Sequence, residues 1–407
     1  MKLETVFARI YRELIEMGCL GCGRQNGGRM GQEKQKAPAG GEKRMSRRTG
    51  MLLLLLLFAV LTALAVLASS GALGGLFTSR TTTVEQSEVT MDTVASLTAT
   101  GPEAEAQAAV DESLERLREL DALAGTGPDS DVSRLAAAAG NGEWVSISPE
   151  VYHMLAVARE YSERTGGAFD VTTGPLVALW GIGTDAAHVP AEADLEAARA
   201  LVDYRALELG EDGQSARLLR SGMSIDLGAV AKGYALDELR RIYEKHHIEN
   251  GLINLGASSI YALGHNDKGT AWRVGIRNPR GTGEEDKLLG VTTLSGQALS
   301  TSGDYERFFE QDGVRYHHIF DPRTGAPAQN GSMSVTVVVD GGTEDAGLLS
   351  DLLTTAVFVL GPQEGQAFLD DMSDEVSGII TTQQRDIYSV RGLGERLSNV
   401  LNTYTLH

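Results

Sequence analysis

The sequence predicts an α+β fold in which antiparallel sheets are flanked by helices. Two observations support this prediction. Helical periodicity dominates the chain from about residue 104 to residue 247, whereas from Gly251 short β-rich segments follow one another, separated by Gly and Asp turns. Helical periodicity returns after Asp340, and no internal repeat is visible.

Six segments have the apolar spacing of helices. In the first, Leu114, Leu117 and Leu120 recur three residues apart, and Gly166 with Gly167 provides a stop for the second. The expected helices are residues 104–123, 149–165, 192–200, 229–247, 346–360 and 364–372. The expected strands are residues 91–99, 251–256, 259–264, 272–278, 290–295, 298–303 and 334–340.

The charge of the chain is unevenly distributed. Residues 81–407 carry 24 Lys and Arg against 50 Asp and Glu, a formal net charge of −26. A body this acidic repels nucleic acid, which argues against nucleic acid as a partner. A phosphorylated ligand would need a local cation, and a divalent metal would supply it.

An uncharged run of eighteen residues, Met51–Ala68, follows Arg44, Arg47 and Arg48. This pattern is typical of a signal peptide or a signal anchor, and the positive-inside rule places the C-terminal body outside the cytoplasm. We favour an uncleaved anchor in the cell membrane; cleavage is the alternative. Cys19 and Cys22 precede the run, and the body has no Cys, so a metal there must be held by oxygen or imidazole.

The expected organisation has five parts. Residues 1–44 are a disordered cytoplasmic leader or an over-long gene start, and residues 45–80 contain the anchor. Residues 81–90 are expected to be a linker, residues 91–390 the catalytic domain and residues 391–407 a C-terminal tail.

The stretch IDLGAVAKGYA begins like a strand and continues as a helix. Its small residues, Gly228 among them, leave room for a ligand at the helix start, where anions are favoured. Asp226 and Lys232 flank that point, which suggests a phosphate site. An ordinary strand, turn and helix is the alternative, and neither the Walker loop nor the dinucleotide fingerprint matches.

The segment SDLLTTA places Asp351 and Thr355 four residues apart on one face of an apolar helix. A buried acid needs a partner. Mg²⁺ binds carboxylate, hydroxyl and carbonyl oxygens, so these two side chains and a carbonyl from the Gly228–Ala229 turn would make a plausible site. An N-capping Asp beside a core Thr is the alternative.

Eight motifs occur in a characteristic order between about residue 91 and residue 361. They are MDT, SRL, GGAFDVTTGPLVALWG, IDLGAVAKGYA, INLG, STSGDYERFF, HHIFDPRTG and DLLTTAVFVLG. Together they resemble the FAD:protein FMN transferases, the ApbE-type family. The resemblance implies a T-fold-related architecture and an extracytoplasmic, Mg²⁺-dependent enzyme. Such an enzyme cleaves FAD at its pyrophosphate, transfers FMN to a Thr hydroxyl of an acceptor flavoprotein and releases AMP.

Carried across residue by residue, the resemblance implies specific ligands. The Mg²⁺ ligands would be the side chains of Asp351 and Thr355 and the main-chain carbonyl of Ala229. The FAD-contacting positions would be Met91, Ala168, Phe169, Asp170, Asp226, Lys232, His318 and Ile319. The incoming Thr needs a base, and His318, or Asp351 beside the metal, is the candidate.

The chain departs from the family pattern at Gly256-Ala257-Ser258, where many relatives have Gly-Gly-Asn or Gly-Gly-Asp, and at Ser350, where Ala is usual. Two other functions stay open: a FAD pyrophosphatase giving FMN and AMP, and a non-enzymatic FAD-binding protein at the cell surface. The chain has no acceptor motif of the type Asp-x-x-Ser/Thr-x-Ala-Thr, so we expect a separate acceptor, such as a membrane electron-transfer subunit.

Overall fold

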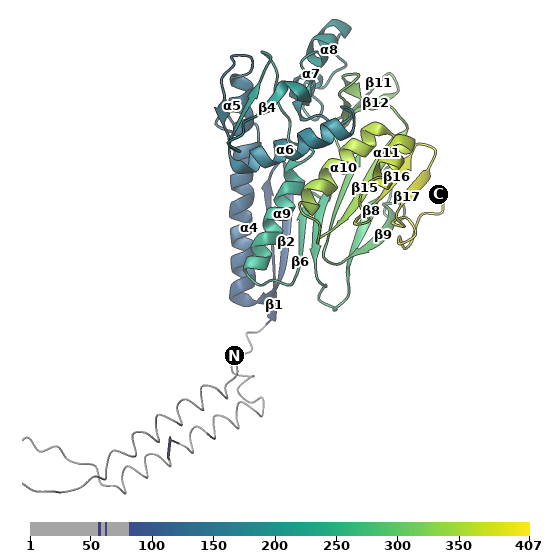
Figure 1. The fold of residues 1–407 in the computed structure, drawn as a ribbon. Coiled ribbons are helices and arrows are strands. Elements are labelled where there is room, and N and C mark those ends of the chain that lie inside the picture. Colours follow the sequence, from purple (N-terminus) through teal and green to yellow (C-terminus); the bar gives the residue numbers. More distant parts are fainter. Residues whose placement is uncertain (1–55, 58–61, 63–80) are drawn as a thin grey trace, which may run out of the picture. The chain divides into compact units, whose positions relative to one another are not determined.

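A computed structural model describes residues 56–57, 62 and 81–407 (Figure 1). The expected leader and nearly all of the expected anchor lie outside these residues. Within the described part of the chain, no helix combines the length and the apolar character needed to cross a membrane. Residues 78–407 form one compact unit, and the following paragraphs concern its described residues.

A nine-stranded sheet runs through this unit, in the order β1-β2-β6-β7-β10-β15-β16-β17-β18. Its neighbours are antiparallel except β17 and β18, which are parallel. The strands are β1 (Thr81–Thr90), β2 (Thr93–Pro102), β6 (Asn250–Leu255), β7 (Ser259–Leu263), β10 (Gln297–Gly303), β15 (Ser332–Asp340), β16 (Val376–Thr382), β17 (Asp386–Val390) and β18 (Thr405–Leu406). The α+β prediction is therefore confirmed.

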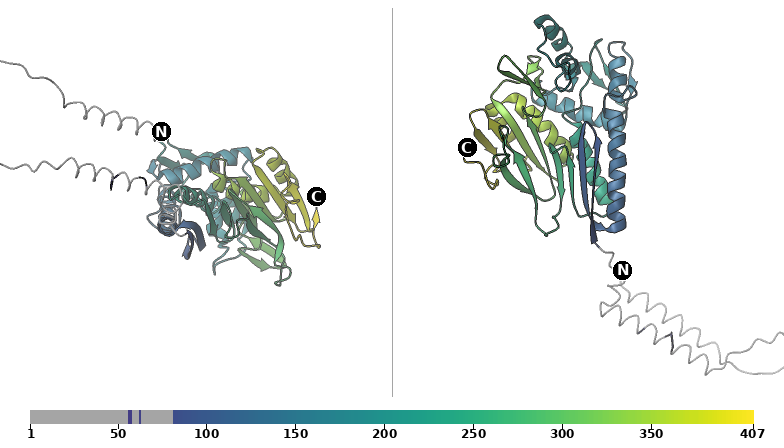
Figure 2. Two further views of the ribbon diagram at one scale, coloured as in Figure 1. Left: turned by 90° about the horizontal axis from the view of Figure 1, so that it is seen from below. Right: turned by 180° about the vertical axis from the view of Figure 1, so that it is seen from behind.

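Four helices cover one face of this sheet, as Figures 1 and 2 show. They are α4 (Glu103–Ala124), α9 (Ala231–Lys245), α10 (Ala346–Leu360) and α11 (Pro362–Asp370). Helix α4 packs on β1 and β2, α9 on β6 and β7, α10 on β10 and β15, and α11 on β16 and β17. The sheet has a hydrophobic core on each face. In β7, where successive side chains point to opposite faces, Tyr261 belongs to the core under the helices and Ile260 to the core on the other face.

The opposite face is covered by the hairpin of β8 (Trp272–Arg277) and β9 (Leu288–Leu294) together with the C-terminal segment. The C-terminal residues 391–407 were expected to be a tail, but Leu393, Leu397 and Tyr404 are buried there, and β18 pairs with β17. These apolar side chains cover a sheet face that would otherwise be exposed to water.

The remaining elements gather at one end of the sheet, the upper end in Figure 1. The helices are α5 (Asp131–Ala137), α6 (Pro149–Arg164), α7 (Gly174–Trp180) and α8 (Glu192–Arg199), with short 3-10 turns η1 (Val171–Thr173) and η2 (Tyr204–Ala206). The strands are β3 (Val145–Ser146), β4 (Leu207–Leu209), β5 (Ser215–Leu218), β11 (Phe308–Gln311), β12 (Val314–His317), β13 (Phe320–Asp321) and β14 (Ala326–Pro327).

Residues 81–90 form strand β1 rather than the expected linker. They pair along their whole length with β2. Alternate residues are exposed, and the others are partly buried except Thr90, which is buried. An edge strand of this kind needs few apolar residues, so its sequence, TTTVEQSEVT, resembles a polar linker.

Helices α9 and α10 cross at two glycines, which fixes their separation. A Cβ added to Gly347 would lie 2.4 Å from the carbonyl oxygen of Gly233, and one added to Gly233 would lie 2.5 Å from that of Gly347. No larger residue fits at either position without moving the backbone.

We predict that Gly347→Ala destabilises the protein, because its methyl group must push α9 and α10 apart. Overpacking of this kind lowers the free energy of unfolding by about 1–3 kcal/mol. Urea unfolding followed by circular dichroism measures the change. Gly127→Ala is the matched control, since no atom lies within 4 Å of its added Cβ. Equal destabilisation of the two variants would contradict the close crossing.

Candidate active site

The turn before α9 is held by its own polar groups. The Asp226 carboxylate accepts a hydrogen bond of 2.8 Å from the Gly228 amide, and the Lys232 ammonium donates to the Gly228 carbonyl at 3.3 Å. The Asp226 amide in turn donates to Val171, at the start of η1. These bonds place Asp226, Ala229 and Lys232 around one turn at the start of the expected helix. The prediction of a strand at the start of IDLGAVAKGYA is wrong, because residues 225–227 form no strand.

Asp351 of α10 reaches the N-terminus of α9 from across the helix crossing. Its Oδ2 accepts from the Gly233 amide at 3.0 Å, and its Oδ1 accepts from the Ser259 hydroxyl at 3.3 Å. The N-cap residue of α9, Val230, has no side-chain group that can cap. Asp351 therefore caps a helix to which it does not belong, a contact worth about 1 kcal/mol in typical N-caps.

Asp237 makes the reciprocal contact. This carboxylate of α9 is fully buried and accepts from the amides of Gly347 and Leu348 in the first turn of α10, both at 2.9 Å. Burial raises the pKa of Asp237 to about 6, while the two amide donors act in the opposite direction. Each helix thus has its N-terminus closed by a carboxylate of the other.

Thr355 lies one turn after Asp351 and is only partly buried. Its hydroxyl has one contact with Ser302, at 3.3 Å. The neighbouring Thr354 is fully buried, and its hydroxyl donates to the Asp351 carbonyl at 2.7 Å and lies 2.8 Å from the Ser302 hydroxyl. Of the two threonines, Thr355 is therefore the one free to bind a ligand.

The side chains on this part of α10 offer oxygen atoms: the Asp351 carboxylate contacts the Ser259 hydroxyl, and one turn later the Thr355 hydroxyl contacts that of Ser302. This donor set fits Mg²⁺, which prefers hard oxygen ligands and usually keeps several waters. No cluster of three or more His, Cys, Asp or Glu side chains suited to a metal occurs among the described residues.

The two adjacent histidines have different environments. His317 is buried, its Nε2 donates to the Ala328 carbonyl at 3.0 Å, and its Nδ1 accepts from the Ile319 amide at 3.3 Å. Both ring nitrogens are therefore occupied. His318 contacts the Arg307 carbonyl through Nδ1 at 3.3 Å, so Nδ1 carries the proton and Nε2 is left as an acceptor.

His318 is only partly buried by surface area, yet desolvation of its ring lowers the pKa to about 3. The positive charge of Arg307 and, more weakly, that of Lys232 act in the same direction. The ring is neutral at physiological pH, with its Nε2 lone pair available. A shared role of His318 and Lys232 in binding FAD stays a prediction.

Four other predicted contacts are buried. Ala168, Phe169 and Ile319 belong to the hydrophobic core, so any contact with a ligand must involve mainly their backbone. Asp170 is also buried, and its carboxylate accepts from the Thr172 amide and hydroxyl and from the Tyr204 amide. Burial raises the pKa of Asp170 despite these donors. Both carboxylate oxygens of Asp170 are therefore hydrogen-bonded within the protein, and these bonds stabilise the loop.

Met91 occupies the turn between β1 and β2, where both Met91 and Asp92 have positive φ, 52° and 55°. A side-chain-bearing residue adopts this left-handed conformation at a cost of roughly 1–2 kcal/mol. A two-residue hairpin turn of type I′ needs positive φ at both central residues, so the turn itself accounts for this geometry. The ligand contact by Met91 stays a prediction.

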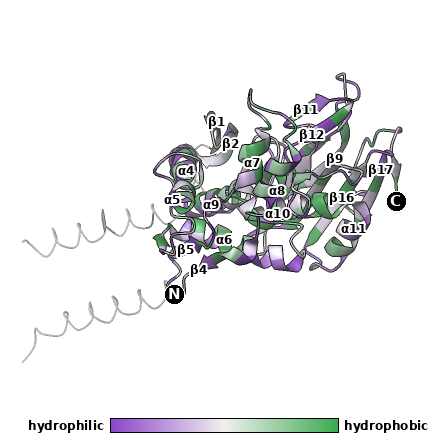
Figure 3. Ribbon diagram, turned by 90° about the horizontal axis from the view of Figure 1, so that it is seen from above, coloured by the Kyte–Doolittle hydropathy of each residue, from purple (hydrophilic) through white to green (hydrophobic). Residues whose placement is uncertain are grey.

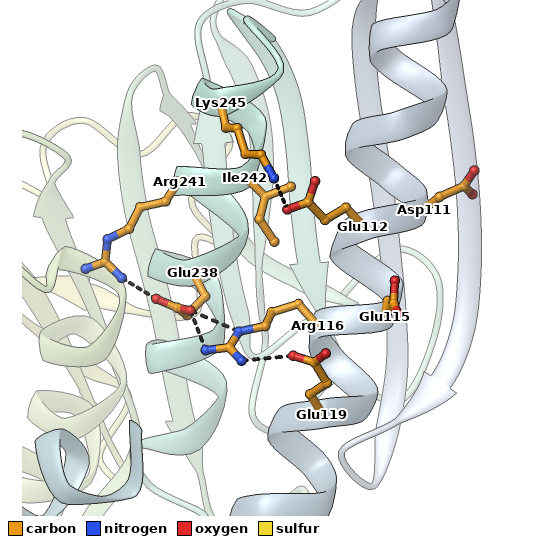
Figure 4. Close-up of a pocket in the computed structure, with 9 residues that line it drawn as sticks. All are labelled: Asp111, Glu112, Glu115, Arg116, Glu119, Glu238, Arg241, Ile242 and Lys245. Carbon is orange, nitrogen blue, oxygen red and sulfur yellow. Dashed lines mark hydrogen bonds and ion pairs between the residues drawn. The ribbon is translucent and has the colours of Figure 1, made fainter. Parts of the chain in front are cut away.

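A groove between α4 and α9 lies apart from these residues (Figure 4). Arg116 pairs there with Glu119, Glu150 and Glu238 at 2.9, 2.6 and 2.7 Å. The lining residues are Asp111, Glu112, Glu115, Arg116, Glu119, Glu238, Arg241, Ile242 and Lys245. Acidic groups outnumber basic ones, so this groove repels phosphates and does not suit a nucleotide.

The sequence profile of the ApbE family matches residues 91–380. The chain belongs to the ApbE family. This ApbE-family chain is 39% identical to a FAD:protein FMN transferase of Klebsiella pneumoniae over 259 residues, 64% of this chain and 77% of the relative. It is 38% identical to a FAD:protein FMN transferase of Treponema pallidum over 282 residues, 66% and 75% of the two chains. The resemblance and the enzyme class, a transferase, are confirmed.

Solved structures agree with the fold. The ApbE protein from Thermotoga maritima has a TM-score of 0.69 at 28% identity, covering 78% of this chain and 100% of the other. The flavin transferase ApbE from Vibrio cholerae has a TM-score of 0.68 at 27% identity, with the same coverage. The ApbE-like architecture expected from the sequence is therefore confirmed.

Four residues of the site were missed by sequence reasoning: Gly233, Asp237, Ser259 and Arg307. Gly233 and Asp237 lie in the expected helix 229–247, where the glycine was a signal for close approach, but its partner Gly347 was not evident. Ser259 contacts Asp351, 92 residues further along the chain, and Arg307 contacts His318 across a hairpin. No local sequence pattern predicts either contact.

We predict that the His318 ring stays neutral between about pH 5 and pH 8, because its pKa of about 3 lies below this range. Long-range ¹H–¹⁵N NMR of ¹⁵N-histidine-labelled protein should show a protonated Nδ1 and an unprotonated Nε2 throughout. An ordinary histidine, with a pKa of about 6.5, would titrate within the range. A His318 midpoint near that value would contradict the burial described above.

Proposed function

We propose that the protein is an Mg²⁺-dependent FAD:protein FMN transferase, which moves FMN from FAD to a Thr hydroxyl of an acceptor flavoprotein and releases AMP. The names of the relatives support FAD as substrate and FMN as the transferred group. The observation that carries the proposal is the bond of the Asp351 carboxylate to the amide of Gly233, the residue that follows Lys232 at the N-terminus of α9. A carboxylate for a metal and the residue that carries an ammonium for phosphate thus meet in the first turn of one helix.

The diphosphate of FAD would lie against the turn before α9. Gly228 and Ala229 present backbone without bulky side chains, and the N-terminus of the helix favours negative charge. Lys232 would exchange its 3.3 Å contact with the Gly228 carbonyl for a phosphate oxygen. Asp226, Met91 and the backbone at Ala168–Asp170 and Ile319 would hold the rest of the nucleotide.

Asp351, Thr355 and the Ala229 carbonyl would hold Mg²⁺. When bound, the metal neutralises phosphate charge and stabilises the leaving AMP. Asp351 is already oriented by Gly233 and Ser259, so little reorganisation is needed. Asp351 remains the second candidate for the base.

His318 would accept the proton of the acceptor hydroxyl. The Thr Oγ forms a bond to the phosphorus of the FMN half, the bond from that phosphorus to the AMP oxygen breaks, and the hydroxyl proton passes to Nε2. The Arg307 carbonyl orients the ring through Nδ1. The negative charge of bound FAD raises the basicity of the ring, because an adjacent anion favours the protonated form.

The expected location follows from the N-terminal sequence. Basic residues before the run Met51–Ala68 favour a body outside the cytoplasm, held at the cell membrane. The acceptor would then be an extracytoplasmic or membrane flavoprotein with a Thr in a motif of the type Asp-x-x-Ser/Thr-x-Ala-Thr. Water competes with this Thr for the same phosphorus, so FAD hydrolysis is the alternative reaction.

We predict that Asp351→Asn abolishes FMN transfer, because it removes the charged metal ligand. The full chain is incubated with FAD, Mg²⁺ and an acceptor domain carrying the Thr motif, and intact-mass spectrometry follows the acceptor. The wild type should add the mass of FMN less water, and EDTA should prevent it. Asp371→Asn, at an exposed carboxylate after α11, is the control and should transfer normally. Full transfer by Asp351→Asn would refute the metal assignment.

We predict that His318→Ala slows transfer by about 10²–10⁴-fold, the usual contribution of a general base. FAD affinity, measured by fluorescence titration, should change little. His265→Ala, at an exposed position, is the control. Transfer at the wild-type rate by His318→Ala would exclude this histidine as the base and leave Asp351 as the candidate.

A further inference from the structure

The hairpin of β11 and β12 forms a sheet of its own, and it lies beside α7 at the edge of the molecule (Figures 1 and 3). The two strands are joined by Asp312 and Gly313, with φ of 53° and 78°. Positive φ at both central residues is typical of a type I′ turn, whose twist matches that of the paired strands. Neither strand joins the nine-stranded sheet, so the hairpin has two outer edges.

The register fixes which backbone groups point outward. The His318 amide donates to the Arg307 carbonyl at 3.1 Å, so this pair is hydrogen-bonded. Bonded and non-bonded pairs alternate along an antiparallel ladder, which makes Phe309 with Tyr316 the next bonded pair. The amides and carbonyls of Phe308 and Glu310 therefore point away from β12.

The two edges differ in how they are covered. On β12 the outward carbonyl of Arg315 accepts a hydrogen bond of 2.9 Å from the Gln329 side chain. On β11 the outward groups of Phe308 and Glu310 have no backbone partner among the described residues. The β11 edge is thus open to another strand.

The hairpin is a firm support for such a strand. Arg315 lies over the Phe308 ring at 4.0 Å and within 3.8 Å of Asp304, a buried carboxylate that also binds Arg280 at 2.6 Å. Phe309 stacks on Tyr316, and Tyr316 packs against Trp180 of α7. The Phe308 ring remains 39% exposed, which offers apolar surface to a partner.

The open edge leads to the candidate base. Arg307 directly precedes β11, His318 directly follows β12, and the two residues form the last rung of the ladder. A strand added to β11 would run about 4.8 Å from it. Because the backbone groups of Arg307 and His318 point toward each other, that strand lies about two strand spacings from His318. The residues of the added segment that continue past Arg307 would have to turn toward the ring.

We propose that the outer edge of β11 docks an extended segment of the acceptor protein by strand addition. The segment would pair with the amides and carbonyls of Phe308 and Glu310, cover the Phe308 ring and deliver its Thr toward His318. This mode needs main-chain groups more than a particular sequence. The inference rests on the proposed transferase function, because that function requires a polypeptide substrate near His318.

The test removes one backbone donor. In Glu310→Pro the outward amide is lost while the bonds to β12 remain, because proline is tolerated at the outer edge of a strand. Glu310→Ala is the matched control: both variants lose the contact of Glu310 with Arg315, and only the proline loses the amide. The full-length proteins are compared for binding of the labelled acceptor domain by fluorescence anisotropy, for FMN transfer by intact mass, and for FAD affinity.

We expect Glu310→Pro to weaken acceptor binding about tenfold relative to Glu310→Ala, with FAD affinity unchanged. Equal acceptor binding by the two variants would overturn the docking inference and leave the transferase function standing. If the wild type binds the acceptor but transfers no FMN, the proposed function fails, and with it this inference.

A second measurement needs no substitution, so it tests the strand-addition proposal even if Glu310→Pro does not fold. Amide hydrogen exchange of the wild type is recorded with and without saturating acceptor domain. The amides of Phe308 and Glu310 should become protected, because they enter a new ladder. Unchanged exchange at both amides would overturn the inference.

Discussion

The exchange of carboxylates between α9 and α10 is the contact on which the rest of the site depends. Asp237 closes the start of α10, and Asp351 closes the start of α9. A buried carboxylate is costly unless hydrogen-bond donors surround it, and helix N-termini supply such donors. The exchange requires the helices to approach closely, which Gly233 and Gly347 permit. Asp351 consequently lies at the start of α9, just after the turn that contains Gly228 and Ala229.

The polar side chains near the site fall into two groups: those whose polar atoms are hydrogen-bonded within the protein, and those that keep an atom able to bind a ligand. Asp170, His317 and Thr354 are buried and have their polar atoms occupied by protein partners. His318 and Thr355 each keep an atom with weak or no protein contact. Adjacent residues of the same type, His317 and His318 or Thr354 and Thr355, therefore have different roles, and their hydrogen bonds distinguish them.

Local sequence predicted what depends on neighbours along the chain. The helix Ala346–Leu360 and the shared face of Asp351 and Thr355 follow from spacing alone. The strand Thr81–Thr90 was missed because an edge strand needs little apolar sequence. The bond between Ser259 and Asp351, 92 residues apart, and the position of Arg307 beside His318 depend on how the elements pack. Ordered motifs indicated the family, but only packing shows which atoms are free.

The position of the metal tests the central claim most directly. Crystals of the protein with FAD and Mn²⁺, a substitute for Mg²⁺ with an anomalous signal, would locate it. The account predicts a peak at about 2.1 Å from the Asp351 carboxylate and the Thr355 hydroxyl, with the FAD diphosphate next to Lys232. A metal bound away from Asp351, or FAD bound away from the turn before α9, would contradict it.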